Sequence, residues 1–211
     1  MPRDYEEKSF WLATAGIAEE NPPLDGDAHV DVAVIGGGFC GISTSYYLKR
    51  ANPSLRVAVL EDRVVGFGAS GRNAGFAMTL MGLTLDITSF RFGKEKTKQA
   101  YDFGHRAVDH IGQLVDSHGI DCDYEKPGLL TVATNKAQLK RLQKEIKLAE
   151  KLGVQGLQWL DAHRTRAEVH SPTYLGARWE EQCALINPAK FVRGMKRVAL
   201  EHGAQVHERT P

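Results

Sequence analysis

The sequence is poor in cysteine and has no long hydrophobic run. Three cysteines in 211 residues, at positions 40, 122 and 183, are an odd and widely spaced set, which favours a reducing cytoplasm over a disulfide framework. The most apolar stretch, residues 75–85, is broken by Asp86 and is too short to span a bilayer. The charged first residues lack the apolar segment of a signal peptide. We therefore expect a cytoplasmic protein without a membrane span.

The sequence also lacks an excess of charge of either sign. Its 27 basic and 26 acidic residues give a net charge of +1, which provides no attraction to nucleic acid or to an anionic membrane. The eight histidines are spread out and none forms a ligand pair with a cysteine, so we expect no metal site. A hydrophobic fraction of 42% and a charged fraction of 25% are those of an ordinary globular protein, and the length suits one large domain or parts of two.

Glycine is concentrated in a segment that follows a predicted strand. Residues 30–35 are an apolar β-type run, and Gly36-Gly37-Gly38-Phe39-Cys40-Gly41 comes directly after it, followed by a helix pattern at residues 42–49. In a dinucleotide fingerprint, the first glycine permits a tight turn and the second lets the backbone approach a pyrophosphate. The third lets the helix pack closely. The unpaired N–H groups at the amino end of the helix then face the phosphates.

An acidic residue stands at the expected distance behind this turn. The apolar run at residues 57–60 predicts a second strand, and Glu61 follows it, 20 residues after Gly41. A carboxylate at this place would accept hydrogen bonds from a ribose hydroxyl. The order of strand, glycine turn, helix, strand and acid predicts a dinucleotide site, whereas a glycine-rich turn alone would be weak evidence. We interpret Cys40 as a small residue facing cofactor or core rather than a nucleophile.

A second glycine-rich loop follows the acid. Residues 66–75 contain four glycines together with Ser70 and Asn73, a composition typical of a loop rather than a helix. Such a loop can turn successive backbone N–H groups inward around an anion, with the Ser70 hydroxyl and the Arg72 guanidinium as further donors. In a nicotinamide-binding unit we would expect a helix soon after the acid. The loop therefore favours a longer, extended cofactor, and a merely flexible loop is the alternative.

These segments resemble a known family. The resemblance is carried by VAVIGGGFCGISTSYYLKR and VAVLEDRVVGFGASGRNAG, which are similar to the N-terminal part of the FAD-dependent amine and amino-acid oxidases, the group with D-amino-acid, glycine and sarcosine oxidases. GFGASGRNAG is closest to gamma-glutamylputrescine oxidase-like members, which also carry an aromatic arm like residues 9–15. The resemblance is specific over residues 10–76 and looser beyond. It implies an FAD-dependent oxidoreductase that takes a hydride from the carbon next to the nitrogen of a small amine or amino acid.

The motifs and the resemblance together predict the residues that contact FAD. They are Gly36, Gly38, Phe39, Cys40, Gly41, Glu61, Asp62, Gly68, Ala69, Ser70, Arg72 and Asn73. No catalytic residue is predicted, because a tyrosine in a predicted helix or strand is more often packing than chemistry. The absence of an acid–base pair does not argue against an enzyme, since in flavoenzymes much of the rate comes from the cofactor.

The rest of the sequence predicts helices and strands in alternation. Helices are expected at residues 94–118, 137–152 and 188–201, the last with Asn187 as its cap and Pro188 in its first position. Strands are expected at residues 121–125 and 129–134, paired through a turn at 126–128, and further strands at 157–160, 175–179 and 205–208.

The resemblance implies an α/β fold, a Rossmann-like FAD-binding domain with a parallel sheet, plus the beginning of an antiparallel α+β substrate domain. Residues 1–29 would be an arm, residues 30–120 and 186–211 an incomplete FAD-binding domain, and residues 121–185 the first segment of the substrate domain. Members of the family are longer, so we expect an N-terminal portion that is inactive alone. The alternatives are a non-catalytic partial dinucleotide-binding module and an NAD(P)-dependent dehydrogenase.

Overall fold

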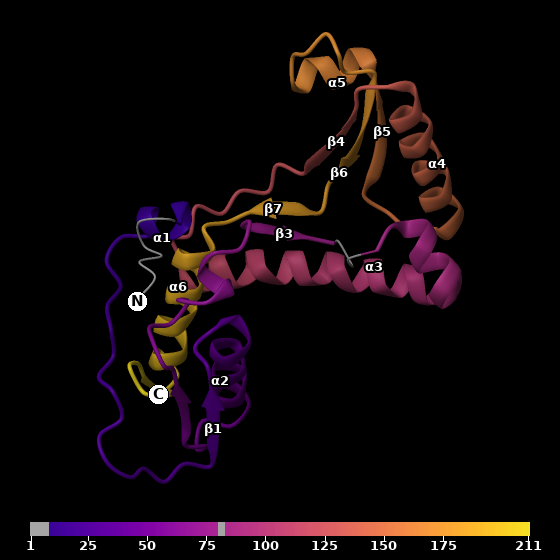
Figure 1. Ribbon diagram of the computed structural model, residues 1–211. Coiled ribbons are helices and arrows are strands. Elements are labelled where there is room, and N and C mark those ends of the chain that lie inside the picture. Colours follow the sequence, from indigo (N-terminus) through magenta and orange to yellow (C-terminus); the bar gives the residue numbers. More distant parts are fainter. Residues whose placement is uncertain (1–8, 80–82) are drawn as a thin grey trace. The chain divides into compact units, whose positions relative to one another are not determined.

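The computed structural model describes residues 9–79 and 83–211, which form two compact units. Unit 1 contains the residues up to Gly75 together with Leu114–Tyr124 and Ile186–Pro211. Unit 2 contains Phe76–Gln113 and Glu125–Leu185. Each unit is built around β-sheet of its own (Figure 1).

Unit 1 is a parallel sheet with helices packed on it. β1 (Val32–Ile35), β2 (Val57–Leu60) and β8 (Gln205–His207) are all parallel and lie in the order β1-β2-β8. α2 (Phe39–Ala51) packs on β1 and β2 and also against α6 (Pro188–Glu201). The central strand is buried, as is usual for parallel sheets that carry helices. The predicted Rossmann-like α/β fold class is confirmed.

The predicted boundaries in unit 1 are close to the observed ones. β2 begins and ends where the sequence predicts, and Asn187 caps α6 by accepting hydrogen bonds from the N–H groups of Ala189 and Lys190. α2 begins at Phe39, three residues before the predicted start. Gly41, which the prediction placed in the turn as the last glycine of the fingerprint, lies inside the first turn of α2.

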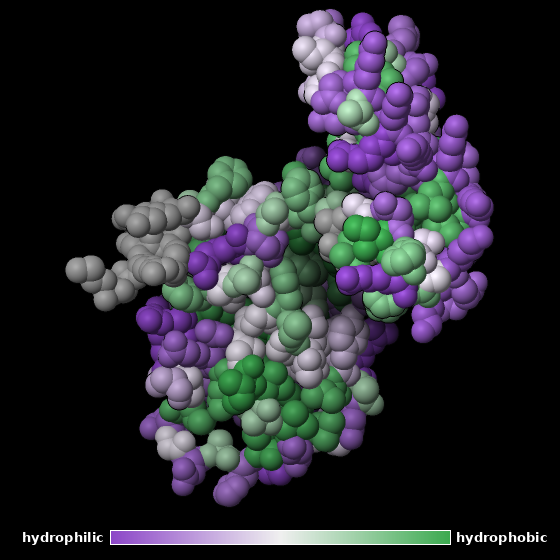
Figure 2. Space-filling view, turned by 45° about the vertical axis from the view of Figure 1, so that its right-hand side comes forward, coloured by the Kyte–Doolittle hydropathy of each residue, from purple (hydrophilic) through white to green (hydrophobic). Residues whose placement is uncertain are grey.

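Unit 1 also exposes hydrophobic residues. β1 is an edge strand, and Ile35 at its carboxyl end is 79% exposed. Figure 2 shows hydrophobic residues gathered over the lower part of the molecule, where β1 and α2 lie. Large exposed apolar patches are typical of surfaces that contact another part of a protein or a partner.

The N-terminal arm contains a short helix that was not predicted. In α1 (Phe10–Thr14), the Ser9 hydroxyl oxygen accepts a hydrogen bond from the Leu12 N–H group, which caps the helix. Five residues are too few to show a helical pattern, and so short a helix depends on tertiary packing, which the buried Leu12 provides. The arm then continues to β1 without further helix or strand (Figure 1).

Unit 2 contains two antiparallel sheets. β4 (Leu129–Ala133), β6 (Gly176–Glu180) and β5 (Leu157–Asp161) form one sheet in the order β4-β6-β5. β3 (Phe76–Met78) and β7 (Cys183–Leu185) form the other. The antiparallel pairing agrees with the α+β class predicted for this part of the chain.

The helices of unit 2 include one that bends. α3 (Leu85–His118) extends the predicted helix by nine residues toward the amino end and kinks at Gly93, whose φ is 79°. Residues 114–118 at its end belong to unit 1. α4 (Lys136–Leu152) begins one residue before the prediction, behind the cap Asn135. The short α5 (Ala162–Glu168) was not predicted.

One predicted strand pair is wrong. Residues 121–125 were expected to pair with residues 129–134, but β4 pairs with β6, and only Glu125 forms an isolated bridge, to Leu185. Asp123 has a φ of 53°, in the left-handed region, which interrupts an extended strand.

The two units divide the chain differently from the predicted domains at residues 76–113 and 121–124. Residues 76–113 pack in unit 2, whereas the prediction placed them with the parallel sheet, and residues 121–124 pack in unit 1, whereas the prediction placed them in the substrate domain. The cofactor and substrate roles of the two domains stay predictions.

Candidate cofactor site

The glycine turn lies at the carboxyl end of β1, between that strand and α2. Gly36 has a φ of 95°, a conformation that residues with a side chain rarely adopt. A Cβ added at Gly41 would lie 1.9 Å from the carbonyl oxygen of Gly36, so α2 is packed closely against the turn. The first N–H groups of α2, which begins at Phe39, have no partner within the helix. Together these features form a backbone cradle at the positive end of a helix dipole.

Gly41→Ala is expected to lower the free energy of unfolding by about 3 kcal/mol, because the methyl group would overlap a backbone oxygen that cannot move without the strand. Gly68→Ala is the matched control: nothing lies within 4 Å of its added Cβ and its φ is −75°, so a change within about 0.5 kcal/mol is expected. Urea unfolding of the flavin-free protein measures both values. Equal stability of the two variants would contradict the close packing.

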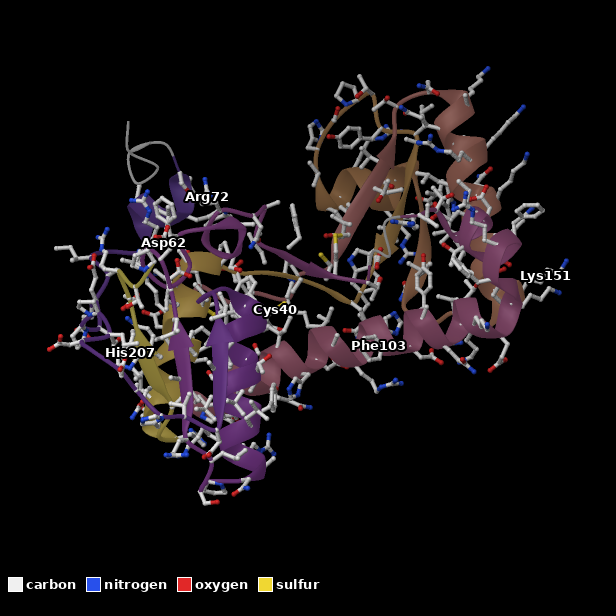
Figure 3. The ribbon with its side chains drawn as sticks, turned by 60° about the horizontal axis from the view of Figure 1, so that its bottom comes forward. Cys40, Asp62, Arg72, Phe103, Lys151 and His207 are labelled. Atoms are coloured by element: carbon white, nitrogen blue, oxygen red, sulfur yellow. The ribbon has the colours of Figure 1, made fainter. Side chains whose placement is uncertain are left out.

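Glu61 lies at the same edge of the sheet as the turn, directly after β2. Its Oε2 accepts a hydrogen bond from the Gly37 N–H group at 2.6 Å, and its Oε1 accepts one from the Arg63 N–H group at 2.9 Å. A carboxylate has about four acceptor positions, so Glu61 can hold the turn and still accept from ribose hydroxyls. The neighbouring Asp62 is exposed (Figure 3), and its carboxylate lies 3.4 Å from the Arg63 guanidinium.

The two glycine-rich segments, which are far apart in the sequence, meet in the structure. The Gly66 N–H group donates to the Gly37 carbonyl oxygen at 3.0 Å, and the Phe39 N–H group donates to the Ser70 hydroxyl oxygen at 2.9 Å. A Cβ added at Gly38 would lie 2.9 Å from that same hydroxyl oxygen. The structure therefore brings Gly38 and Phe39 together with Ser70, which accepts a hydrogen bond and keeps its own O–H available as a donor.

Two other predicted residues make contacts within the second loop. Arg72 donates to the Gly68 carbonyl oxygen at 3.1 Å, and its guanidinium carbon lies 5.6 Å from the centre of the Phe67 ring. The Asn73 side chain donates to the carbonyl oxygens of residues 69 and 70 and accepts from the N–H group of residue 75. These contacts shape the loop, which includes a 3₁₀ turn at Ala69–Gly71. The predicted contacts of Arg72 and Asn73 with the cofactor stay predictions.

The three cysteines are free thiols. Cys40 is exposed in the first turn of α2 (Figure 3), whereas Cys122 and Cys183 are buried. Burial raises the pKa of Cys122 to about 11 and also raises the pKa of Cys183, so neither is a thiolate near neutral pH. Within residues 9–79 and 83–211, no group of three or more His, Cys, Asp or Glu side chains could hold a metal ion.

Two buried charged residues that lie next to the second loop were not identified from the sequence. The Glu208 carboxylate accepts a hydrogen bond from the Val65 N–H group at 2.6 Å and forms an ion pair with Lys196 at 2.9 Å. Glu208 follows β8 directly, as Glu61 follows β2, so a carboxylate at a strand end was the available signal. Lys196 gave no signal, because a lysine within an amphipathic helix normally faces solvent.

This arrangement fits an extended dinucleotide. The turn offers backbone without side chains beside the amino end of α2, where a pyrophosphate would be stabilised. Glu61 stands at the end of the adjacent strand, where an adenosine ribose would lie. The second loop adds the Ser70 hydroxyl, which accepts a hydrogen bond from the Phe39 N–H group at the start of α2.

Comparison with known proteins gives matches along nearly the whole chain. The family model described as FAD dependent oxidoreductase (DAO) matches residues 31–211. The gamma-glutamylputrescine oxidoreductase of Escherichia coli is 32% identical over 95% of this chain and 46% of its own length. The probable oxidoreductase OrdL of Haemophilus influenzae is 29% identical over 98% of this chain and 48% of its own length. The chain thus spans about half the length of these relatives.

A solved structure supports the same fold. The crystal structure of glycine oxidase from Geobacillus kaustophilus superimposes with a TM-score of 0.68, at 22% identity, over 85% of this chain and 46% of that one. A helix long and apolar enough to cross a membrane does not occur in the part of the chain that the structure describes.

Proposed function

Because the chain belongs to the DAO family of FAD-dependent oxidoreductases, we propose that the natural protein carrying it oxidises the carbon–nitrogen bond of an amine or amino acid, with FAD accepting the hydride. One observation supports the cofactor site most strongly: Glu61 and Ser70 both form hydrogen bonds with the turn at residues 36–41, at one edge of the sheet. The nitrogen-containing substrate is supported by the match to the Escherichia coli relative, whose name includes gamma-glutamylputrescine. We also propose a cytoplasmic location, which the odd and widely spaced set of three cysteines supports.

In this proposal the chain supplies the adenosine diphosphate half of the site. Backbone N–H groups at the start of α2 bind the pyrophosphate, the Glu61 carboxylate accepts from the ribose, and the Ser70 hydroxyl donates to a phosphate oxygen. FAD itself supplies the two-electron acceptor. The protein's part is to orient that acceptor and to exclude water from it.

The activity belongs, in this proposal, to a protein of the length of its relatives. Residues 1–211 correspond to about half of those proteins. Binding energy from one half of a ligand does not secure the other half when that half is unrestrained. We therefore propose that residues 1–211 alone bind FAD weakly and turn over no amine.

Two alternative functions remain to be compared with this proposal: an NAD(P)-dependent dehydrogenase and a binding module without turnover. An NAD(P)-dependent dehydrogenase is disfavoured because the family shown by residues 31–211 uses FAD. A binding module without turnover predicts flavin that no substrate reduces, which a reduction experiment can detect.

The test is anaerobic mixing of the natural full-length flavoprotein with gamma-glutamylputrescine, with glycine and with a 2-hydroxy acid. We expect an amine or amino acid to bleach the visible flavin absorption and to be converted to the corresponding imine or carbonyl compound. Reduction by the 2-hydroxy acid alone would contradict carbon–nitrogen oxidation. Flavin that responds to none of a broad panel of amines and amino acids would favour the binding module.

A further inference from the structure

The N-terminal arm fills space that two glycines of the second loop leave open. A Cβ added at Gly75 would lie 2.8 Å from Cζ2 of Trp11, and a Cβ added at Gly71 would lie 3.4 Å from Cδ2 of Leu12. The indole ring and the leucine side chain therefore lie directly against the loop backbone. The far end of the cofactor loop rests on α1.

The arm then runs beside α6, where individual polar contacts hold it. Arg193 donates to the carbonyl oxygen of Gly16 at 2.8 Å, and the Lys196 ammonium donates to the carbonyl oxygen of Glu19. An open cavity of about 670 Å³ is lined here by the arm, by α6 and by residues 119–121. Discrete hydrogen bonds, rather than continuous close packing, therefore attach this part of the arm to α6.

Glu208 joins the arm to the beginning of the same loop. One carboxylate oxygen accepts from the Asn21 N–H group of the arm and the other accepts from the Val65 N–H group of the loop, each at 2.6 Å. The Lys196 ammonium lies 2.9 Å away, and the side chains of Glu208 and Lys196 are 1% and 9% exposed. A buried carboxylate requires its partners, because loss of one leaves charge or donors uncompensated. Displacement of the arm would therefore disturb the loop at this end too.

We propose that the arm, residues 9–24, is a clamp that positions the second glycine loop for FAD, with Trp11 and Glu208 as positioning residues at the two ends of the loop. The proposal rests on the cofactor site proposed above. Between the two clamped ends, the Ser70 hydroxyl oxygen accepts a hydrogen bond from the Phe39 N–H group and so ties the loop to the amino end of α2. When the arm is docked, Ser70 and the backbone N–H groups of the loop are fixed before FAD arrives, which lowers the entropy cost of binding.

Thermodynamic linkage couples docking of the arm to binding of FAD, so the clamp can be tested from either side. If a docked arm favours bound FAD by some factor, bound FAD favours the docked arm by the same factor. FAD should therefore slow amide hydrogen exchange at residues 10–16, a readout that needs neither a variant nor enzyme activity. A segment outside the site, such as α4, provides the reference for general stabilisation.

The variant test uses two aromatic residues of the same helix. Trp11→Ala removes the ring that lies against Gly75, whereas Phe10→Ala removes a ring that is 70% exposed and whose centre lies 5.1 Å from that of the Trp11 ring. In the full-length holoprotein, we expect Trp11→Ala to raise the FAD dissociation rate about tenfold and Phe10→Ala to leave it within about twofold. Trp11→Phe, which keeps an aromatic ring against the glycine, should restore most of the retention. Release of flavin fluorescence on dilution measures each rate.

The possible results of these experiments distinguish a failure of the clamp proposal from a failure of the proposed FAD site. Wild-type protein that binds no FAD would overturn both. Protein that binds FAD, but whose arm exchanges no more slowly in its presence relative to α4, would overturn the clamp alone. Equal dissociation rates for Trp11→Ala and Phe10→Ala would overturn it as well, and a slower-exchanging arm together with rapid dissociation from Trp11→Ala would support it.

Discussion

Replacement of Gly38 by valine is expected to abolish FAD loading of the natural full-length protein. Gly38 is the N-cap of α2, and in the proposed site it is where the backbone would approach the pyrophosphate most closely. Valine methyl groups would occupy the space of the phosphate oxygens, and the Cβ alone would already lie 2.9 Å from the Ser70 hydroxyl oxygen. Flavin absorption per protein after purification is the measurement, with circular dichroism showing whether the variant folds.

A double variant separates the two steric effects. In Gly38→Ala with Ser70→Gly, the clash with the hydroxyl is removed, so a remaining loss of FAD arises at the cofactor itself. Ser70→Gly alone is the matched reference. Stoichiometric flavin in folded Gly38→Val protein would show that the turn does not face the pyrophosphate.

Glu61→Ala is expected to weaken FAD binding by about 1.5–3 kcal/mol, the usual value for hydrogen bonds to a charged group. The carboxylate stands at the end of β2 and faces the turn through its hydrogen bond with the Gly37 N–H group. Equilibrium titration of the flavin-free full-length protein measures the change in affinity.

An altered ligand tests whether the ribose is the partner of Glu61. FAD that lacks the 2′-hydroxyl group of its adenosine ribose should bind more weakly than FAD to the wild-type protein. It should bind Glu61→Ala about as well as FAD does, because the two changes remove the same interaction. If the losses simply add, Glu61 acts only by holding Gly37 and Arg63, and the ribose assignment is wrong.

The glycine turn at residues 36–41 could be predicted because the sequence pattern that marks it is local. Strand, glycines, helix and acid follow one another within residues 30–61, and each has a fixed place in the chain. The same is true of α6, whose start is marked by Asn187 and Pro188. Such features can be predicted without knowing which other parts of the chain pack against them.

The arm and its anchor could not be predicted in this way. Glu208 meets Asn21 and Val65 across 187 and 143 residues of sequence, and no periodicity marks such contacts. The three-residue strands β3 and β7 are too short to show alternation. The sequence identified Arg72 as a possible hydrogen-bond donor. It could not predict the direction of the side chain, which lies over the Phe67 ring.

The most direct test of the central claim is the identity and amount of nucleotide released when the natural full-length protein is purified and denatured. Mass and absorption should identify FAD, at one molecule per chain, either free in solution or attached to a peptide. The account then predicts that Gly38→Val protein releases none. Release of a nicotinamide dinucleotide, or a folded wild-type protein that holds no nucleotide after incubation with FAD, would contradict it.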